Sequence, residues 1–347
     1  MTYLGALVDP VHTPTRLIEI ARSLEDWGFS SFWYPDEKYF RDCYVGLSLV
    51  ALNTRHLRLG PCITDPYSRH PILTAVSIGT LAEVAPGRVW LGIGAGGRGL
   101  PEIGVTPVRP AVAIREAIEI IRGLLNGQSV DYQGEILKLK DRPLDFQSPK
   151  DVKIMVGTGH GRFVQQLAGE VADAVMLANY ANPESLQNSL RWVEKGAAKA
   201  GKHLTDRYLI SRVDVAIHDD GAKARAAVAP KILSALRASY PGLNYLEDLP
   251  EFQLSSRLLE VLAKKDYRSR MYYANPSNSA PLIPDLLTRQ MAVAGTPHEV
   301  AAQLSAIQEM DVFQEITIRP VPCPGQDYLE ALSMFYRTVV STLKINR

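Results

Sequence analysis

The 347-residue chain has 46% hydrophobic residues, 22% charged residues and a formal net charge of +1. These values allow a large buried core, in one large α/β barrel or in two ordinary domains. The near-neutral charge and the lack of long lysine or arginine runs argue against a protein that binds nucleic acid or acidic membranes, so we expect a small-molecule ligand.

Short apolar runs alternate with amphipathic stretches along the whole chain. The runs that we predict as strands are residues 4–8, 31–34, 57–63, 89–93, 154–156, 174–177, 210–217 and 315–318. Eight strands with helices between them are typical of one α/β fold, the (β/α)8 TIM barrel. Because the chain has no internal repeat or low-complexity linker, we expect residues 1–347 to form a single domain.

Helix signals support these boundaries. Thr13-Pro14 opens a predicted helix that Gly28 closes. Asn182-Pro183 and Thr296-Pro297 repeat the opening signal, and Glu299 completes a capping box with Thr296.

Two stretches interrupt the alternation of strands and helices. Residues 129–146 alternate like a small hairpin after the fourth helix. Residues 241–290 carry five prolines around one amphipathic segment, 252–267, and are too long for a plain connection. We predict that 241–290 is an insertion before the eighth strand, serving as a lid or as a subunit contact.

Polar residues follow the first two predicted strands. Asp9 and His12 come after the first, either as substrate-binding residues or as helix-entry residues. Asp36 and Glu37 end the second, where a carboxylate can act as an acid or base if burial tunes its pKa. The alternative is that Glu37 and Lys38 are surface charges.

The third and fourth strands both end in polar or flexible segments on one side of a strand-helix-strand unit, where α/β proteins place their chemistry. The turn after the third strand offers Asp65, Tyr67, Arg69 and His70 to a cofactor or an anionic substrate. His70, which precedes a proline, is equally suited to start a helix.

Residues 92–97 match the dinucleotide pattern G-x-G-x-x-G, and Glu116 lies at the distance expected for a ribose contact. Prolines at 101, 107 and 110 prevent the immediate helix that a Rossmann site needs. The glycines either let the backbone approach a flat ring or simply turn the chain. The residues that we place at the ring are Gly94, Ala95 and Gly96.

A second glycine-rich loop follows the fifth strand and precedes a helix. Its glycines free backbone N–H groups, Thr158 offers a hydroxyl, Arg162 offers a bidentate donor, and the helix contributes its positive end. We predict an anion site; the alternative is a turn with a solvated arginine. The residues of the predicted site are Gly157, Thr158, Gly159, His160, Gly161 and Arg162.

The three cysteines, Cys43, Cys62 and Cys323, are far apart and lack metal-ligand spacing, so we expect reduced thiols and no metal site. The first residues reach Asp9 and Pro10 before a signal-type apolar stretch, and no run of about 18 apolar residues occurs elsewhere. We therefore expect a soluble, cytoplasmic protein without a membrane partner.

Residues 57–97 and 154–177 resemble the luciferase-like flavin and deazaflavin oxidoreductases, especially the branch with coenzyme F-420 that includes methylene-tetrahydromethanopterin reductase. The resemblance spans residues 1–343 or so. It implies a luciferase-like TIM barrel with a flavin-type cofactor in its C-terminal mouth. It also implies that the 157–162 loop holds the phosphate of FMN or of the deazaflavin.

The resemblance adds a specific feature at the third strand. The family carries a non-prolyl cis peptide behind the central ring, and the pattern G-P-x-[IV]-T-x-P-Y places it at Cys62–Ile63, followed by Thr64. From the residues alone, Cys62 would be a buried small residue.

This chain differs from the family pattern at two positions. Family members show Asp followed by a proton-transferring His where this chain has Asp36 and Glu37, and the F-420 branch often has a carboxylate where this chain has Gly97. These differences leave the direction and the substrate of the reaction open.

The resemblance implies an enzyme that moves a hydride between coenzyme F-420 and an organic substrate, with Asp36 and Glu37 as catalytic residues. Asp9, His12, Tyr67 and Arg69 are the candidate substrate contacts. One alternative is an FMN-dependent monooxygenase that uses reduced flavin and oxygen, because Arg162 suits an FMN phosphate. Another alternative is a flavin-binding protein without catalysis.

Two predicted helices are more apolar than one solvent-exposed face requires, at residues 45–52 and 73–81. Family members commonly pair at this place. We expect a homodimer; otherwise the 241–290 insertion would have to cover these helices.

Overall fold

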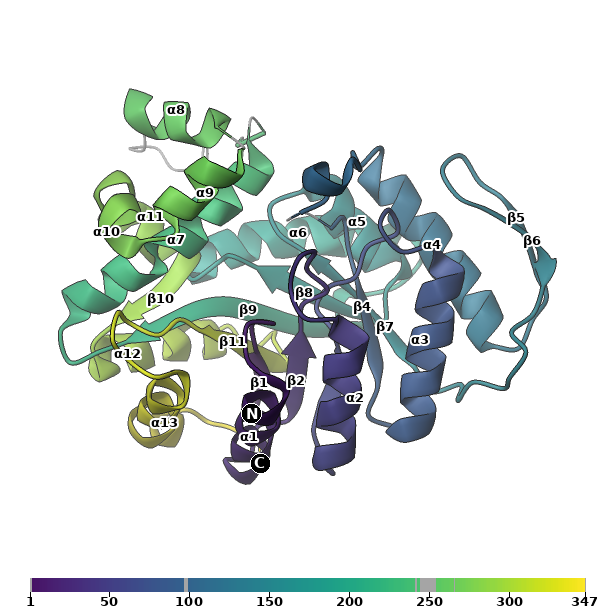
Figure 1. Cartoon of the computed structure of the whole chain (residues 1–347), viewed down its shortest axis with the longest axis horizontal. Helices are drawn as coiled ribbons and strands as arrows, with labels where there is room; N and C mark the ends of the chain where they lie inside the picture. Colours follow the sequence, from purple (N-terminus) through teal and green to yellow (C-terminus); the bar gives the residue numbers. More distant parts are fainter. Residues whose placement is uncertain (1, 97–98, 241, 244–253, 265, 347) are drawn as a thin grey trace.

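The computed structural model describes residues 2–96, 99–240, 242–243, 254–264 and 266–346. Its centre is a barrel of eight parallel strands in the order β3-β2-β1-β11-β9-β8-β7-β4 (Figure 1). The strands are β1 (Tyr3–Leu7), β2 (Ser31–Tyr34), β3 (Arg58–Pro61), β4 (Trp90–Ile93), β7 (Lys153–Thr158), β8 (Ala174–Ala178), β9 (Tyr208–Ile217) and β11 (Glu315–Pro320). Parallel bridges from Leu59 to Val89 and from Thr64 to Ile93 nearly close the barrel between β3 and β4. The predicted (β/α)8 barrel is confirmed.

Helices cover the outside of the barrel. They are α1 (Pro14–Asp26), α2 (Cys43–Asn53), α3 (Pro71–Val84), α4 (Pro110–Leu125), α5 (Arg162–Val171), α6 (Pro183–Lys199), α7 (Gly221–Ser239), α12 (Pro297–Gln308) and α13 (Tyr328–Thr338). The predicted caps are confirmed: Thr13 accepts from the Arg16 N–H, and Thr296 and Glu299 form both halves of a capping box. Gly28 has a φ of 77°, the left-handed conformation that ends α1.

The predicted hairpin is present as β5 (Val130–Gln133) and β6 (Lys138–Arg142), which pair antiparallel. The carboxylate of Glu116 on α4 accepts the backbone N–H groups of Glu135 at 2.6 Å, Ile136 at 3.1 Å and Leu137 at 2.7 Å. Glu116 therefore fastens the hairpin and is not a ribose ligand. Since α4 begins at Pro110, no helix starts at the described glycines 92–96, which agrees with the rejection of a Rossmann site.

The part of the 241–290 stretch that the structure describes is helical, with α8 (Ser256–Ala263), α9 (Tyr267–Tyr273), α10 (Pro276–Ser279) and α11 (Asp285–Met291). These helices gather on α7, and Leu258, Leu262 and Leu287 share a core with Leu233 of that helix (Figure 1). Residues 241, 244–253 and 265 of the predicted insertion lie outside the described residues, as do Gly97 and Arg98.

One strand was not predicted from the sequence: β10 (Ala292–Gly295), which pairs in parallel with the C-terminal half of β9. Its four small residues, Ala-Val-Ala-Gly, are too few to show a strand period. The strand extends the sheet beyond the end of β8 and carries the chain back from the insertion to α12.

At the N-terminal end of the strands, the barrel interior holds a polar cluster around Glu315, which is fully buried. Its carboxylate accepts hydrogen bonds from Ser31, Trp33, Thr317, Arg58 and Tyr208, and the Arg58 guanidinium also lies over the Tyr208 ring. We call these residues the floor network: Ser31, Trp33, Arg58, Tyr208, Glu315 and Thr317. Each side chain in the network makes at least one hydrogen bond within it.

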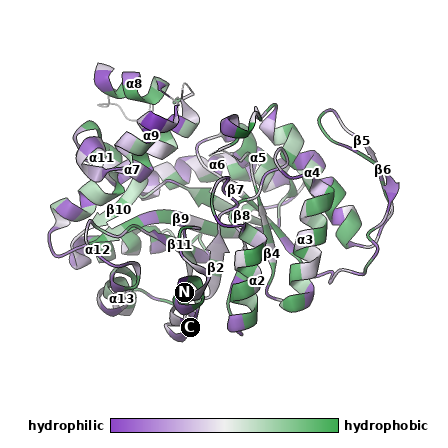
Figure 2. Ribbon diagram, viewed as in Figure 1, coloured by the Kyte–Doolittle hydropathy of each residue, from purple (hydrophilic) through white to green (hydrophobic). Residues whose placement is uncertain are grey.

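Helices α2 and α3 present apolar side chains to solvent, among them Val45, Leu52 and Leu73, which are 63%, 72% and 54% exposed. Figure 2 shows both helices as largely hydrophobic ribbons. None of the helices in the described ranges is long and apolar enough to cross a membrane.

Candidate functional site

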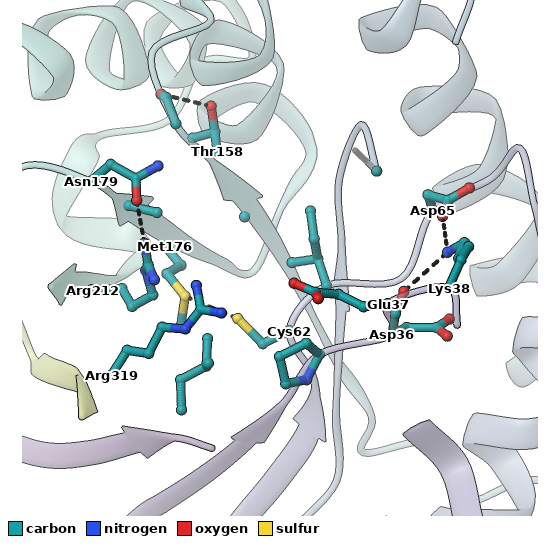
Figure 3. A pocket seen from close by; sticks show the side chains of 17 residues that line it. Asp36, Glu37, Lys38, Cys62, Asp65, Thr158, Met176, Asn179, Arg212 and Arg319 are labelled. Carbon is teal, nitrogen blue, oxygen red and sulfur yellow. Dashed lines mark hydrogen bonds and ion pairs between the residues drawn. The ribbon is translucent and has the colours of Figure 1, made fainter. Parts of the chain in front are cut away.

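A cavity opens where the barrel strands end (Figure 3), and each barrel strand, or the segment directly after it, contributes to its lining. This is the C-terminal end of the strands, where TIM barrels place their active sites. The lining residues are Leu7, Pro35, Asp36, Glu37, Lys38, Cys62, Ile63, Asp65, Gly96, Gly157, Thr158, Gly159, Met176, Ala178, Asn179, Arg212 and Arg319. Eight of the predicted site residues are in this set: Asp36, Glu37, Cys62, Ile63, Gly96, Gly157, Thr158 and Gly159.

One wall of the cavity is the end of β3, where the Cys62–Ile63 peptide bond is cis, as the resemblance implied. The Ile63 side chain packs against two glycines. A Cβ on Gly94 would lie 2.1 Å from Ile63 Cδ1, and a Cβ on Gly157 would lie 2.5 Å from Ile63 Cγ2. Only glycine permits this close approach at both positions. Gly94 therefore leaves room for the Ile63 side chain, while Gly96 lines the cavity.

Thr64 follows this wall in the chain and is fully buried. Its backbone bonds to Gly92 and Gly94, and its hydroxyl donates to Asp36 Oδ2 at 2.7 Å. Like Ala95, Thr64 is absent from the described cavity lining, so its contribution is to hold neighbouring segments in place.

The two predicted catalytic carboxylates point in different directions. The carboxylate of Glu37 faces the cavity on the side of Cys62 and Arg319, whereas that of Asp36 turns away (Figure 3). Asp36 accepts from Thr64 and lies 3.7 Å from Arg69 Nε. The geometry makes Asp36 a positioning residue, whereas the Glu37 carboxylate faces the cavity.

Lys38 is not the surface charge that sequence analysis considered. Its ammonium donates to Asp65 Oδ2 at 2.6 Å and to the Asp36 carbonyl at 3.0 Å. Burial alone would raise the pKa of Asp65, but its bonds to Lys38 and to the backbone and hydroxyl of Ser68 hold that pKa below its ordinary value. The pair fixes the turn after β3 at the cavity rim.

The first residues of the predicted phosphate loop line the cavity, and its last residues are exposed at the surface. Gly157, Thr158 and Gly159 line the cavity, and Gly161 starts α5 without a side-chain cap. His160 packs edge-on against Tyr180, with ring centroids 4.6 Å apart, and burial lowers the pKa of its imidazole to about 3. The loop therefore offers backbone donors and a neutral histidine at pH 7.

Arg162 lies outside the described cavity lining. It is exposed, and its guanidinium lies over the rings of Phe163 and Trp192 at 5.2 and 5.9 Å. It lies at the start of α5, three residues after the lining residue Gly159.

The four predicted substrate contacts also lie outside the described lining. His12 packs edge-on against Tyr328 at 4.5 Å, and burial lowers the pKa of His12. Tyr67 donates its hydroxyl to the Val108 carbonyl at 2.9 Å. Arg69 lies over the Tyr44 ring at 4.7 Å. These contacts give the three residues packing and positioning roles.

Asp9, the fourth predicted substrate contact, belongs to a cluster of polar and charged side chains. The cluster as a whole was not predicted from the sequence. Asp9 Oδ1 accepts from Arg319 Nε at 2.8 Å, and its Oδ2 accepts from Lys231 Nζ on α7 at 2.7 Å. Arg212 on β9 donates to Asp214 Oδ1 at 3.0 Å and to the side chain of Asn179. We call these residues the mouth network: Asp9, Asn179, Arg212, Asp214, Lys231 and Arg319.

Mutual stabilisation keeps Asp9 and Arg319 charged. Burial alone would raise the pKa of Asp9, but the charges of Arg319 and Lys231 hold it well below its ordinary value. Burial alone would lower the pKa of Arg319, but the negative charges of Asp9, Asp214 and Glu37 raise that pKa above its ordinary value. The sequence signal for this cluster is an arginine and an aspartate two residues apart in a mostly apolar strand, 208–217.

Comparisons with known proteins agree with this fold. The family model described as luciferase-like monooxygenase matches residues 3–312. The chain is 31% identical over 324 residues to a 5,10-methylenetetrahydromethanopterin reductase of Archaeoglobus fulgidus, covering 92% of this chain and 93% of the relative.

Two solved structures share the fold. The coenzyme F-420-dependent tetrahydromethanopterin reductase of Methanopyrus kandleri superposes with a TM-score of 0.83 at 25% identity, over 99% of each chain. An F-420-dependent secondary alcohol dehydrogenase in complex with an F-420–acetone adduct superposes with a TM-score of 0.78 at 19% identity, again over 99% of each chain.

Proposed function

The chain belongs to the luciferase-like monooxygenase family of flavin- and deazaflavin-dependent oxidoreductases, and we propose that it transfers a hydride between coenzyme F-420 and an organic substrate. The relatives described above support the choice of cofactor, since two of their names state that they depend on F-420. The finer assignment depends on the cavity.

The cavity suits a flat ring system. Its wall at Cys62 and Ile63 has glycine backbone beside it, and the neighbouring lining residues Leu7 and Met176 are apolar. An apolar pocket with a few polar groups at one end is typical of small-molecule sites. Cys62 and Ile63 would support the ring, the backbone of 157–161 would meet the phosphate, and Arg162 would cover it from outside.

When bound, the deazaflavin supplies or accepts the hydride at a carbon of its central ring. Glu37 presents its carboxylate to the cavity and would hold or move the accompanying proton on an Oε atom. Asp36, fixed by Thr64 and Arg69, would position the segment that carries Glu37. The observation that carries the proposal is the Glu37 carboxylate facing the cavity beside Cys62, at the place of the family histidine.

Adding F-420 and FMN separately and following fluorescence quenching tests this proposal. We expect F-420 to bind, and turnover with F-420 to consume no oxygen. Binding of reduced FMN alone with oxygen consumption would support a monooxygenase, and binding of either cofactor without turnover on any substrate would support a non-catalytic protein.

We also propose that the chain forms a homodimer through α2 and α3. The exposed Val45, Leu52 and Leu73 support this, because apolar groups on one outer face gain from burial against a partner. Sedimentation at micromolar concentration should give about twice the 38.3 kDa mass of the chain. A monomer under these conditions would contradict the proposal.

A further inference from the structure

Lys38 and Asp65 form a buried ion pair at the cavity, and both residues contribute to its lining. Lys38 Nζ lies 2.6 Å from Asp65 Oδ2, and the two side chains are 12% and 1% exposed. The carboxylate also accepts three hydrogen bonds from its own turn, namely from the backbone N–H groups of Tyr67 and Ser68 and from the Ser68 hydroxyl. Asp65 is therefore fixed by the segment after β3 and gives Lys38 a rigid partner.

The residues before and after Glu37 are both bonded to this segment. The Lys38 ammonium donates to the Asp36 carbonyl at 3.0 Å as well as to Asp65. The Asp36 carboxylate accepts the Thr64 hydroxyl at 2.7 Å. Both flanking side chains thus reach to one side, whereas the Glu37 carboxylate faces the cavity on the other side (Figure 3).

Two glycines after β4 make room for the ion pair. A Cβ on Gly96 would lie 2.8 Å from Asp65 Cβ, and a Cβ on Gly99 would lie 2.6 Å from Lys38 Cβ. Both glycines have a positive φ, 69° and 86°, which side chains disfavour. These glycines of the run after β4 therefore let the chain pass close to the pair. Segments that follow three strands, β2, β3 and β4, meet at Lys38 and Asp65.

Stability alone does not account for the pair. The cost of taking two charges out of water offsets most of their attraction, so a buried ion pair adds little stability over apolar side chains of similar size. The pair does supply a fixed arrangement, because one ammonium meets two acceptors on different segments, Asp65 and the Asp36 carbonyl. An apolar side chain in place of Lys38 would leave the segment that carries Glu37 without this constraint.

We propose that Lys38 is a positioning residue for Glu37. Its two hydrogen bonds hold the Glu37 carboxylate toward the cavity, where the proposed function needs a group that holds or moves a proton. Lys38 acts through Glu37, because its ammonium lies on the Asp65 side of the segment and not beside Cys62 (Figure 3). The inference rests on the proposed function for the role of Glu37 in the reaction, but the direction of Glu37 can be measured without the cofactor.

Crystal structures of the full chain without cofactor test the direction of Glu37. Lys38→Met leaves the Asp65 charge buried without its partner and can unfold the chain. The double variant Lys38→Met/Asp65→Asn removes that charge, and its amide oxygen can still accept from the turn. The Glu37 carboxylate should face the cavity in wild type and leave this place in the double variant. A Glu37 carboxylate in the same place in both structures overturns the proposal.

Steady-state kinetics test the action through Glu37. The assay uses reduced F-420 with 5,10-methylenetetrahydromethanopterin, the compound in the name of the Archaeoglobus fulgidus relative. The double variant should lower turnover at least about tenfold and change the Kd of F-420 less than about twofold, because only the carboxylate is displaced. In a Glu37→Gln background the same double change should lower turnover less than about twofold, since residues that act as a unit are not additive.

The matched control is Lys199→Met on α6. Lys199 is 69% exposed and lies 3.8 Å from Glu170, so its loss should change neither turnover nor the direction of Glu37.

Two kinetic results would count against Lys38 as a positioning residue. A loss of turnover that multiplies with that of Glu37→Gln would mean that the pair acts on another group. An equal loss of F-420 affinity and turnover would mean that the pair only supports the fold of the mouth. If wild type binds no F-420, the proposed function fails. In that case, and if this compound is not turned over, the crystal structures decide the proposal by themselves.

Discussion

The barrel encloses two charged networks that differ in one respect. In the floor network, Glu315 is fully buried and accepts hydrogen bonds from five side chains. In the mouth network, Arg212 is almost as buried but its Nε has no partner among the described residues, and the side chain lines a cavity. A charge whose bonds are all made inside a buried cluster stabilises one structure, whereas charged groups that line a cavity lie where a ligand can meet them. Position at the cavity, more than burial, separates the two roles.

Glu315→Ala should give the largest effect on stability, because it leaves Arg58 without its counter-charge. Removing one partner of a buried ion pair costs about 3–5 kcal/mol of unfolding free energy. Urea unfolding monitored by circular dichroism measures it. The control is Asp145→Asn at the exposed Arg142–Asp145 pair, which should change stability by at most about 1 kcal/mol. A small loss for Glu315→Ala would end the distinction between the two networks.

Glu37→Gln tests the catalytic side of the comparison. The amide keeps the size of the side chain but cannot exchange a proton, so turnover should fall about a hundredfold with little change in F-420 affinity. Steady-state kinetics and fluorescence quenching give the two quantities. Glu184→Gln, an exposed change on α6, is the control. Equal turnover in Glu37→Gln and wild type would make Glu37 a packing residue.

Arg162→Ala tests whether the phosphate lies beyond the described cavity lining. Because this guanidinium is exposed, we expect F-420 affinity to fall by about 1.5 kcal/mol, the lower end for a hydrogen bond to a charged group. The comparison variant is Arg191→Ala, an exposed cation on α6. If both variants bind F-420 like wild type, Arg162 is only a surface residue stacked on Phe163 and Trp192.

The mouth network should be sensitive to acid. Since the charges of Arg319 and Lys231 hold the pKa of Asp9 below its unfolded value near 3.9, ionised Asp9 contributes stability above about pH 4. That contribution is lost as the pH falls toward the folded pKa, with a slope of at most about 1.4 kcal/mol per pH unit. Unfolding of wild type and Asp9→Asn at pH 7 and below pH 4 measures it. A difference between them that does not shrink in acid would contradict this assignment.

Local features were predictable from the sequence. The caps at Thr13 and Thr296 and the hairpin at 129–146 depend on residues a few positions apart, so pattern and spacing sufficed. The loop at Gly157 was found because its glycines lie between a predicted strand and a predicted helix, and parallel strands in a barrel put their C-terminal ends on one side. Cys62 and Glu37 were found through the family resemblance at the ends of the third and second strands, although the direction of the Glu37 side chain was not predicted.

Only the tertiary structure decided which of these polar residues meet. Arg319 and Asp9 are 310 positions apart, and Lys231 and Asp9 are 222 apart. The Arg319–Asp9 contact depends on the register of β11 beside β1, and the Lys231–Asp9 contact depends on how α7 packs on the barrel; no local pattern encodes either. For the same reason the sequence could not show that Glu116 fastens a hairpin, that Gly94 seats Ile63, or that Asp36 turns from the cavity while Glu37 faces it. Local preferences fix where strands and turns begin, whereas the closing of the barrel fixes which side chains share its mouth.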